Sequence, residues 1–194
     1  GNLTASWTQR AKLLASDGAA EDLFGTSVAI DGDTMVIGAP IRDNSDPVLA
    51  NNHKGPGTTY IYTRDIAGSV TASWTQRAKL QRGDLQQLDR NYDGFGCSVA
   101  ISGDTVVVGA ARHNGYSGSA YIFTRDVAGS LTASWTQSAE LNPVDYTREF
   151  GESVALSGDT VVVGTSYIGT RSGQAIVFTR DVAGNLTASW TQRA

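Results

Sequence analysis

The sequence predicts an all-β protein built from three similar units, each with four antiparallel strands. The first observation is the composition, because 22 glycines and only 18% charged residues favour tight turns over helices. The second is a repeat that reads FGTSVAI at 24–30, FGCSVAI at 95–101 and FGESVAL at 150–156. The third is that the same further apolar segments follow each copy in the same order. One structural unit is therefore repeated along the chain.

The first two strands of the first unit are predicted at 24–30 and 34–39. Asp31 and Gly32 join them, and the other two units have Ser-Gly at this place. Two-residue connections of this kind favour the primed turns that match the twist of neighbouring strands. A β-hairpin therefore opens each unit.

The second strand is expected to be buried on both of its faces. It contains an unbroken β-branched segment, as at 106–108 in the second unit, where a half-buried strand would alternate with polar residues. A strand of this kind lies in a sheet that is covered on both sides.

The third and fourth strands are predicted at 57–63 and 73–80. The loop between them reads RDIAGSVTAS in the first unit and is nearly identical in the others, which argues for a structural role. The corresponding strands begin at 95, 104, 118 and 134 in the second unit and at 150, 160, 174 and 189 in the third.

Four antiparallel strands cannot cover both faces of their own sheet, so neighbouring units are expected to stack face to face as the blades of a β-propeller do. Phe24, Phe95 and Phe150 occupy the same position in the three units. We expect them to pack between adjacent blades, together with the valine segments.

The spacing of Phe24-Gly25 and Gly38-Ala39-Pro40 resembles the FG-GAP repeat of integrin α-subunit propellers, and the strands containing YIFTRD and WTQ resemble a bacterial-type variant. The resemblance covers every part of the chain, although GAP becomes GAA and GTS in the later units. It implies extracellular, non-catalytic propeller blades. Related blades often hold calcium between their first two strands, but the turns here are too short to supply six to eight oxygen ligands.

The predicted units divide the chain into four segments: an outer strand of a preceding or neighbouring blade at 1–13, then blades at 14–80, 81–141 and 142–194. The first segment is surplus, because GNLTASWTQRA occurs identically at the start and at the end of the chain. An unpaired strand is an exposed edge that recruits partners. We expect either a longer array of repeats or strand addition, in which residues 4–13 complete the last blade of a neighbour in place of 187–194. Head-to-tail contacts of this kind give a ring or a filament.

The charge pattern makes nucleic acid a poor partner, because the formal charge is -4 and lysines and arginines are not clustered. No apolar segment approaches the roughly 20 residues that span a bilayer. Cys97 is the single cysteine, so an intramolecular disulfide is excluded.

Ligand-binding candidates come from the loops that differ most between the units, because variable loops on a rigid scaffold commonly carry binding sites. These candidates are Arg42, Asp43, Asn51, Asn52, His53, Arg112, His113, Tyr116, Tyr167 and Arg171. The alternative is that these loops vary because nothing constrains them.

Two other motifs name further candidates. Asp89, Asn91 and Asp93 fit the start of a calcium loop, but the bidentate acid that completes such a loop is missing, and Asp93 is also explained as a turn residue. Asn2 and Asn185 begin N-glycosylation sequons. No cofactor is otherwise expected.

Arg82-Gly83-Asp84 matches an integrin-recognised adhesive tripeptide, although the repeat itself accounts for the aspartate. Catalysis is disfavoured, because the serine that follows each FG pair recurs in every unit and is therefore a scaffold residue. The sequence thus predicts an extracellular assembly or adhesion module that is not an enzyme. The alternative is a propeller that binds a protein or a glycan through its variable loops.

Overall fold

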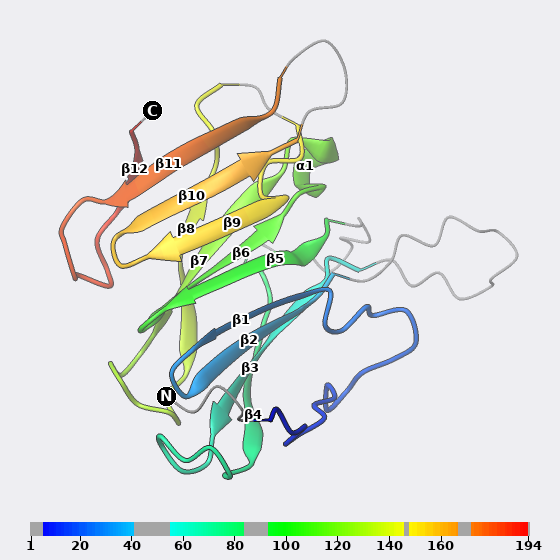
Figure 1. Cartoon of the computed structure of the whole chain (residues 1–194). Coiled ribbons are helices and arrows are strands. Elements are labelled where there is room, and N and C mark those ends of the chain that lie inside the picture. Colours follow the sequence, from blue (N-terminus) through cyan, green and yellow to red (C-terminus); the bar gives the residue numbers. More distant parts are fainter. Residues whose placement is uncertain (1–5, 41–54, 84–92, 146–147, 167–171, 194) are drawn as a thin grey trace, which may run out of the picture.

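The structure is a computed structural model that describes residues 6–40, 55–83, 93–145, 148–166 and 172–193. In these residues, twelve strands form three four-stranded antiparallel sheets, and the three sheets follow one another in chain order (Figure 1). One four-residue helix, α1 (His113–Tyr116), precedes β7. No helix in the described part of the chain is long and apolar enough to cross a membrane.

Each sheet contains four strands that are consecutive in the sequence, and we call each sheet a blade. Blade one contains β1 (Ser27–Asp31), β2 (Thr34–Ala39), β3 (Thr58–Arg64) and β4 (Trp74–Leu80). Blade two contains β5 (Phe95–Ser102), β6 (Thr105–Ala110), β7 (Ser119–Arg125) and β8 (Trp135–Leu141). Blade three contains β9 (Ser153–Ser157), β10 (Thr160–Thr165), β11 (Gln174–Arg180) and β12 (Trp190–Gln192).

The first strands of blades one and three begin later than predicted, at Ser27 and Ser153 instead of 24 and 150. The glycine of the FG pair is left-handed in all three blades, with φ values of 93° at Gly25, 94° at Gly96 and 95° at Gly151. In blade two the strand continues through this bend, because Phe95 pairs with Ala110 before a register shift, whereas in blades one and three the pairing with the second strand begins only at the serine. All other predicted strand starts agree with the structure to within one residue.

The core lies between the blades. Val36, Ile61 and Leu80 of blade one pack against a larger apolar surface of blade two, and a second cluster joins blade two to blade three. Val106 and Val108 of β6 belong to the first cluster, while Val107 between them belongs to the second. Every residue of β6 is buried, which confirms the predicted burial on both faces for blade two. In blade three, Thr160 of β10 is exposed and Val162 is only partly buried.

The recurring phenylalanines pack as predicted where a preceding blade exists. Phe95 and Phe150 are fully buried in the two clusters, and the Phe95 ring centroid lies 5.6 Å from that of Tyr121. Phe24 is only partly buried, because no preceding blade packs against it among the described residues.

Candidate functional site

The same cluster of charged and aromatic side chains recurs at the end of the third strand of every blade. In blade one, Arg64 Nε donates to Asp33 Oδ1 at 2.7 Å, and the guanidinium carbon lies 4.6 Å from the centroid of the Trp74 ring. The N–H of Gly68 donates to the other oxygen of Asp33 at 2.8 Å. The corresponding clusters contain Asp104, Arg125 and Trp135 in blade two and Asp159, Arg180 and Trp190 in blade three. A planar guanidinium can form an ion pair and stack on a ring at the same time, so this cluster fixes the repeated loop between the third and fourth strands.

The arginine of this cluster also bonds to the preceding blade. Arg125 Nη2 donates to Thr34 Oγ1 at 3.0 Å, and Arg180 Nη2 donates to Thr105 Oγ1 at 2.8 Å. Both arginine side chains are nearly inaccessible, at 4% and 3%, whereas that of Arg64 is 15% exposed. Burial lowers the pKa of Arg125, and the nearby Asp104 carboxylate opposes this effect. The arginine therefore connects neighbouring blades as well as its own loop.

The recurring serine of the first strand makes a second repeated bond between blades. Ser27 Oγ donates to the carbonyl of Gly96 at 2.7 Å, and Ser98 Oγ donates to the carbonyl of Gly151 at 2.6 Å. Each serine thus contacts the FG glycine of the next blade. This geometry supports the interpretation of these serines as scaffold residues.

The glycines of the second strand make room for this contact. A Cβ atom at Gly38 would collide with the carbonyl of Gly96, and one at Gly109 would collide with the carbonyl of Gly151. Two glycine positions of the repeat therefore meet at each boundary between blades, which accounts for the spacing between the FG pair and the later glycine.

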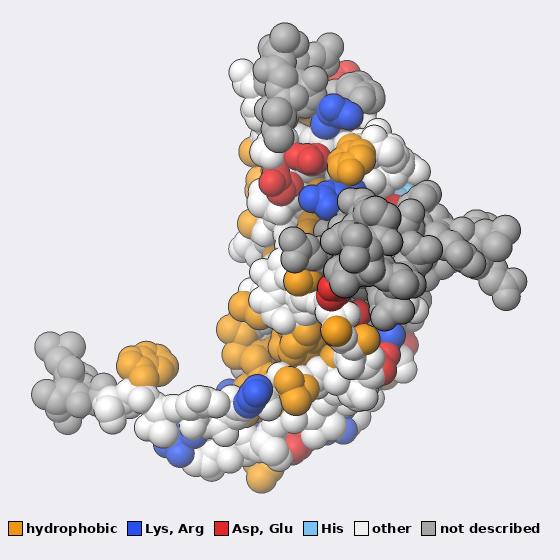
Figure 2. Space-filling view, turned by 90° about the vertical axis from the view of Figure 1, so that its right-hand side faces the viewer, with side chains coloured by type: hydrophobic (Ala, Val, Ile, Leu, Met, Phe, Trp, Pro, Cys, Tyr) orange, Lys and Arg blue, Asp and Glu red, His pale blue; other side chains and the backbone are white. Residues whose placement is uncertain are grey.

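The face of blade one that corresponds to the face by which blade two packs against blade one is exposed. Val28 and Ile30 are 69% and 60% exposed, whereas their counterparts Val99 and Ile101 in blade two are 8% and 9% exposed. We call the surface formed by Val28, Ile30 and Arg64 the leading face. Figure 2 shows apolar side chains gathered on the body of the molecule close to the projecting N-terminal segment.

Blade three leaves open the complementary face. Ser153, Ala155 and Thr160 are exposed, and we call the surface that they form the trailing face. Their counterparts in blade two include Ser98 and Thr105, which are 8% and 2% exposed and bond to blade three. The trailing face therefore presents hydroxyl groups that are used at both internal boundaries.

The N-terminal segment has the sequence of a fourth strand but forms no strand here. Residues 6–15 have no regular secondary structure, and Trp7 is 102% exposed. Leu13 and Ala15 nevertheless pack against the apolar cluster of blade one. That residues 1–13 serve a neighbouring blade therefore remains a prediction.

The residues that follow this segment are held by a contact that recurs in every blade. Gln76 Oε1 accepts the N–H of Ser16 at 3.0 Å, and Gln76 Nε2 donates to Ser16 Oγ at 3.0 Å. The same backbone contact joins Gly83 to Gln137 in blade two and Val144 to Gln192 in blade three. The glutamine of each WTQ strand therefore fixes the linker that enters its own blade.

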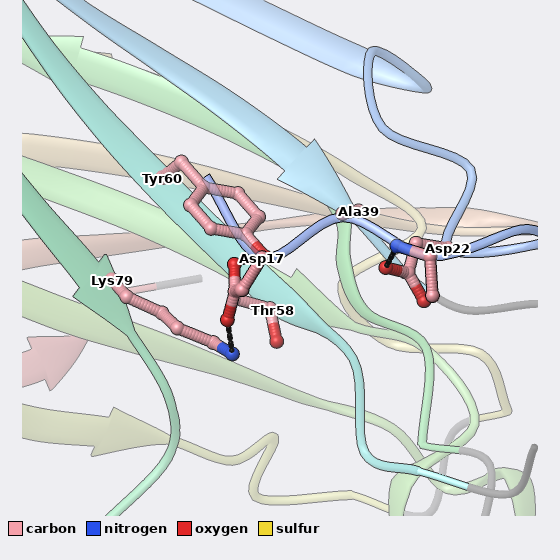
Figure 3. A pocket seen from close by; sticks show the side chains of 7 residues that line it. Asp17, Asp22, Ala39, Thr58, Tyr60 and Lys79 are labelled. Carbon is pink, nitrogen blue, oxygen red and sulfur yellow. Dashed lines mark hydrogen bonds and ion pairs between the residues drawn. The ribbon is translucent and has the colours of Figure 1, made fainter. Parts of the chain in front are cut away.

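A small polar pocket of about 200 Å³ lies between this linker and blade one (Figure 3). Asp17 accepts hydrogen bonds from Lys79 Nζ at 2.6 Å and from the Tyr60 hydroxyl at 2.9 Å. The Lys79 bond, followed by the Tyr60 bond, lowers the pKa of Asp17. Burial, followed by the hydrogen bond to Asp17, raises the pKa of Tyr60. Asp22 accepts the N–H of Ala19 at 2.7 Å on another side of the pocket. These groups fix the linker to β3 and β4.

The structure places three of the predicted ligand-binding residues on or next to α1. Tyr116 is 43% exposed, and Arg112 lies over its ring at 6.0 Å from the centroid. His113 is buried, with 6% exposure, so it does not present its side chain to solvent as the loop prediction assumed. Asn114 and Gly115 adopt left-handed conformations that turn the chain here. The other candidates lie outside the described residues, namely Arg42, Asp43, Asn51, Asn52, His53, Tyr167 and Arg171.

Arg82 and Asp93 form a buried ion pair that the sequence motifs did not suggest. Arg82 Nη2 lies 2.7 Å from Asp93 Oδ2, and His113 Nδ1 lies 3.4 Å from Asp93 Oδ1. Arg82 is 3% exposed, which argues against its use in an adhesive tripeptide. Of the three calcium candidates, Asp93 forms an ion pair with the Arg82 side chain. Asp89 and Asn91 lie outside the described residues. No group of three or more metal-binding side chains occurs among the residues that the structure describes.

Of the two sequons, only Asn185 is described, and it lies in an exposed loop. Its Oδ1 accepts hydrogen bonds from both the N–H and the hydroxyl of Thr187, at 3.0 Å and 2.8 Å. Asn2 lies outside the described residues.

The hydrogen bonds between the arginine of one blade and the threonine of the preceding blade were not predicted from the sequence. The only sequence signal for them is that the arginine recurs in each TRD segment and the threonine in each DT segment. The sequence alone did not indicate that the arginine reaches the blade before its own.

Stacked four-stranded sheets with the same contacts at each boundary define a repeat protein of the β-propeller type. The chain belongs to the FG-GAP repeat family, whose model matches residues 7–62, 74–123 and 135–178. A search of curated proteins gave no match.

Proposed function

We propose that the chain is a non-catalytic extracellular module for structural assembly or adhesion, which joins other blades of its own kind head to tail. The observation that carries this proposal is the pair of open faces. The leading face presents apolar groups and an arginine, and the trailing face presents a serine and a threonine. The same groups are paired with one another at both internal boundaries. The partner is therefore a second copy of this chain or an adjacent repeat.

The internal boundaries indicate how two copies would meet. Ser153 of one copy would donate to the carbonyl of Gly25 in the next, as Ser98 does to Gly151. Arg64 of the second copy would reach Thr160 of the first in the same way that Arg180 reaches Thr105. This heterologous contact leaves one open face at each end, so it leads to a closed ring or to a filament.

Apolar burial supplies the driving force for this contact. Val28 and Ile30 would pass from more than half exposed to nearly buried, as their blade-two counterparts are. Full burial of an aliphatic side chain contributes about 1.5 to 3 kcal/mol.

An extracellular, non-enzymatic role agrees with the family, whose repeats typically occur in extracellular propeller and adhesion domains. The described site residues support it as well. Each repeated serine is used between blades where a next blade exists, and His113 is buried beside Asp93.

Ligand binding through the variable loops is the second candidate, and Tyr116 is the observation that favours it. This residue has a φ of 73° and is partly exposed beneath Arg112. A strained backbone that presents an aromatic ring is a common feature of binding sites. If this candidate is correct, the wild-type chain will bind a member of a glycan array or a protein array. The Tyr116→Ala variant will then not bind that member.

The assembly proposal is tested by measuring particle mass against concentration with multi-angle light scattering. We expect the wild-type chain to form multiples of its 20.4 kDa mass, and the double variant V28D/I30D to remain monomeric. The matched control is V70D/V127D, because these valines are 73% and 61% exposed in loops. A wild-type chain that stays monomeric at its highest soluble concentration would rule out self-assembly.

A further inference from the structure

We infer that the boundary between blades two and three carries a binding site for the guanidinium group of an arginine side chain of a partner protein. The site lies where the end of β7 and the strand β8 meet the loop that follows β11. This inference goes beyond the assembly proposal, because the site uses neither the leading face nor the trailing face.

The corresponding site of blade one is filled by a side chain of the blade itself. Arg77 of β4 donates from Nε to Thr63 Oγ1 at 3.0 Å and from Nη2 to Asp65 Oδ1 at 3.0 Å. The Thr63 hydroxyl donates in turn to the carbonyl of Leu131 in blade two at 3.1 Å. An arginine of the fourth strand thus pairs with a threonine and an aspartate beside the loop of the next blade.

Blade three contains the same pair of contacts. Arg193 Nε donates to Thr179 Oγ1 at 2.6 Å, and Arg193 Nη2 donates to Asp181 Oδ1 at 3.2 Å. Two donors of one planar guanidinium therefore reach two acceptors, which the single ammonium of a lysine does not match. The threonine and the aspartate belong to the TRD segment of every blade, so each blade carries both acceptors of a guanidinium.

Blade two has these acceptors but has a serine in place of the arginine. Thr124 and Asp126 belong to its TRD segment, and Ser138 occupies the position of Arg77. The register between the third and fourth strands shifts at this position in both blades, so the two side chains extend from the same β-bulge. Ser138 Oγ donates to the carbonyl of Ile122 at 3.4 Å, within its own blade. The backbone is therefore the same, and the side chain is shorter.

A pocket of about 470 Å³ lies among these residues. Asp126, Ser138 and Thr187 are exposed, so the pocket opens to solvent. The Asp126 carboxylate accepts a hydrogen bond from Thr136 Oγ1 at 2.8 Å, and within the described part of the chain no basic side chain pairs with it. The lining consists of Thr124, Arg125, Asp126, Thr136 and Ser138 of blade two and Leu186 and Thr187 of blade three.

The arginine in this lining does not prevent a second guanidinium from binding. Arg125 already pairs with Asp104, with 3.1 Å between Nε and Oδ1, and donates to Thr34 of blade one. Arg64 and Arg180 have the same position in blades one and three, where a second arginine is nevertheless bound. The charge of Asp126 is thus the one that a cation from outside would meet.

A surface arginine of a partner protein fits this pocket best. Small-molecule sites are mostly apolar clefts that enclose their ligand, whereas this pocket is open and is lined largely by hydroxyl and charged groups. Leu186, which is partly buried, offers an apolar contact for the methylene groups of an arginine side chain. Arginine is also enriched where proteins meet. The guanidinium would donate to Thr124 and Asp126 as Arg77 donates in blade one.

NMR titration of the whole chain with N-acetyl-arginine methylamide tests the inference. We expect the backbone amide signals of Asp126, Ser138 and Thr187 to shift until they saturate. N-acetyl-lysine methylamide should bind at least about tenfold more weakly, because one ammonium does not serve both acceptors in the same geometry. Equal binding of the two compounds would reveal a general cation site and overturn the inference, as would the absence of saturable shifts.

Variants at the serine and the aspartate locate the site. Ser138→Arg introduces the residue that folds at this position in blades one and three, so it should fill the pocket and abolish the shifts. Asp126→Asn should weaken binding at least about tenfold, because hydrogen bonds to charged groups are the stronger ones. Shifts of wild-type size in Ser138→Arg would place the binding elsewhere and overturn the inference.

The matched control makes blade one resemble blade two. Arg77→Ser removes the guanidinium that donates to Thr63 and Asp65, and should create a second site at which the amide signals of both residues respond. A folded Arg77→Ser chain that binds at blade two alone would contradict the origin of the site in this exchange of arginine for serine.

Ethylguanidinium separates a protein arginine from a free guanidine compound. We expect both ethylguanidinium and the blocked arginine to shift the same signals, because the pocket is open enough to admit a side chain that is attached to a backbone. If ethylguanidinium binds and the blocked arginine does not, the pocket takes a small guanidine and the inferred partner is wrong.

Discussion

The contribution of a residue to stability depends on whether its blade has a neighbour on the side to which that residue points. Phe95 and Phe24 occupy the same place in the repeat, yet Phe95 is fully buried and Phe24 is only partly buried. The same contrast separates Thr105, which is 2% exposed, from the exposed Thr160. Each pair therefore offers a substitution together with its own matched control.

Phe95→Ala should lower the free energy of unfolding by about 3 to 5 kcal/mol, because it leaves a cavity between blades one and two. Phe24→Ala should cost clearly less, since part of that ring already faces solvent. Urea titration of both variants at a concentration where the chain is monomeric measures the difference. Equal losses would mean that the two positions are packed alike.

Thr105→Val removes the acceptor of a hydrogen bond from the buried Arg180. Leaving such a charged donor without its partner costs about 1 to 3 kcal/mol. Thr160→Val, on the trailing face, should change the unfolding free energy of the monomer by less than about 0.5 kcal/mol. Thermal unfolding of the two variants measures this contrast, and a large loss for Thr160→Val would contradict an open trailing face.

At the scale of the elements, the repeat made the strands predictable. A four-strand pattern that occurs three times leaves little freedom for the bounds of any strand, as β2 and β10 illustrate. The starts of β1 and β9 were missed because, among the three FG pairs, only Phe95 pairs with the second strand of its blade, opposite Ala110. The three FG pairs are identical in sequence and share a left-handed glycine, so the sequence does not show which of them continues the strand.

The candidate site was less predictable, because its contacts join segments that are far apart in the sequence. Arg82 pairs with Asp93, which is not its neighbour in the sequence, and His113 is turned inward by the left-handed residues after it. Variation between repeats does not distinguish exposed from buried loop side chains. Tyr116 and the buried His113 were therefore predicted on the same grounds.

The linker that enters blade one gives a prediction that depends on pH. Lys79→Met should raise the pKa of Asp17, because the Lys79 bond is the largest cause of its lowered value. A lowered carboxyl pKa contributes stability above the ordinary aspartate pKa of about 4, and this contribution is lost as the pH falls through the lowered value. The variant should therefore lose less stability in acid than the wild type does.

Carboxyl chemical shifts from NMR titration measure the pKa of Asp17, and unfolding at several pH values measures the linkage. Lys12→Met is the control, because Lys12 has the same place in WTQRAKL and is exposed. An unchanged Asp17 pKa in Lys79→Met would show that the ion pair of Figure 3 is not maintained in solution.

For the whole molecule, the stack predicts a gradient of stability along the chain. Blade two is covered on both sides, and every residue of β6 and β7 is buried, whereas β1 and β9 each have exposed positions. In repeat proteins, stability is approximately the sum of unit and boundary contributions. Amide hydrogen exchange of the monomer should therefore be slowest in β6 and β7 and faster in both outer blades. Uniform exchange rates would indicate a single cooperative unit.

Blades that share their boundary contacts can be gained or lost as whole units. Both boundaries use the same serine, glycine, arginine and threonine positions, so these contacts do not fix the order of the blades. Removing or duplicating the segment 81–141 would therefore join surfaces that already fit. The nearly identical loops that follow each RD pair are also long stretches at which recombination could occur in register. The length of the array is thus free to vary by whole blades while these repeated serine, glycine, arginine and threonine contacts are preserved.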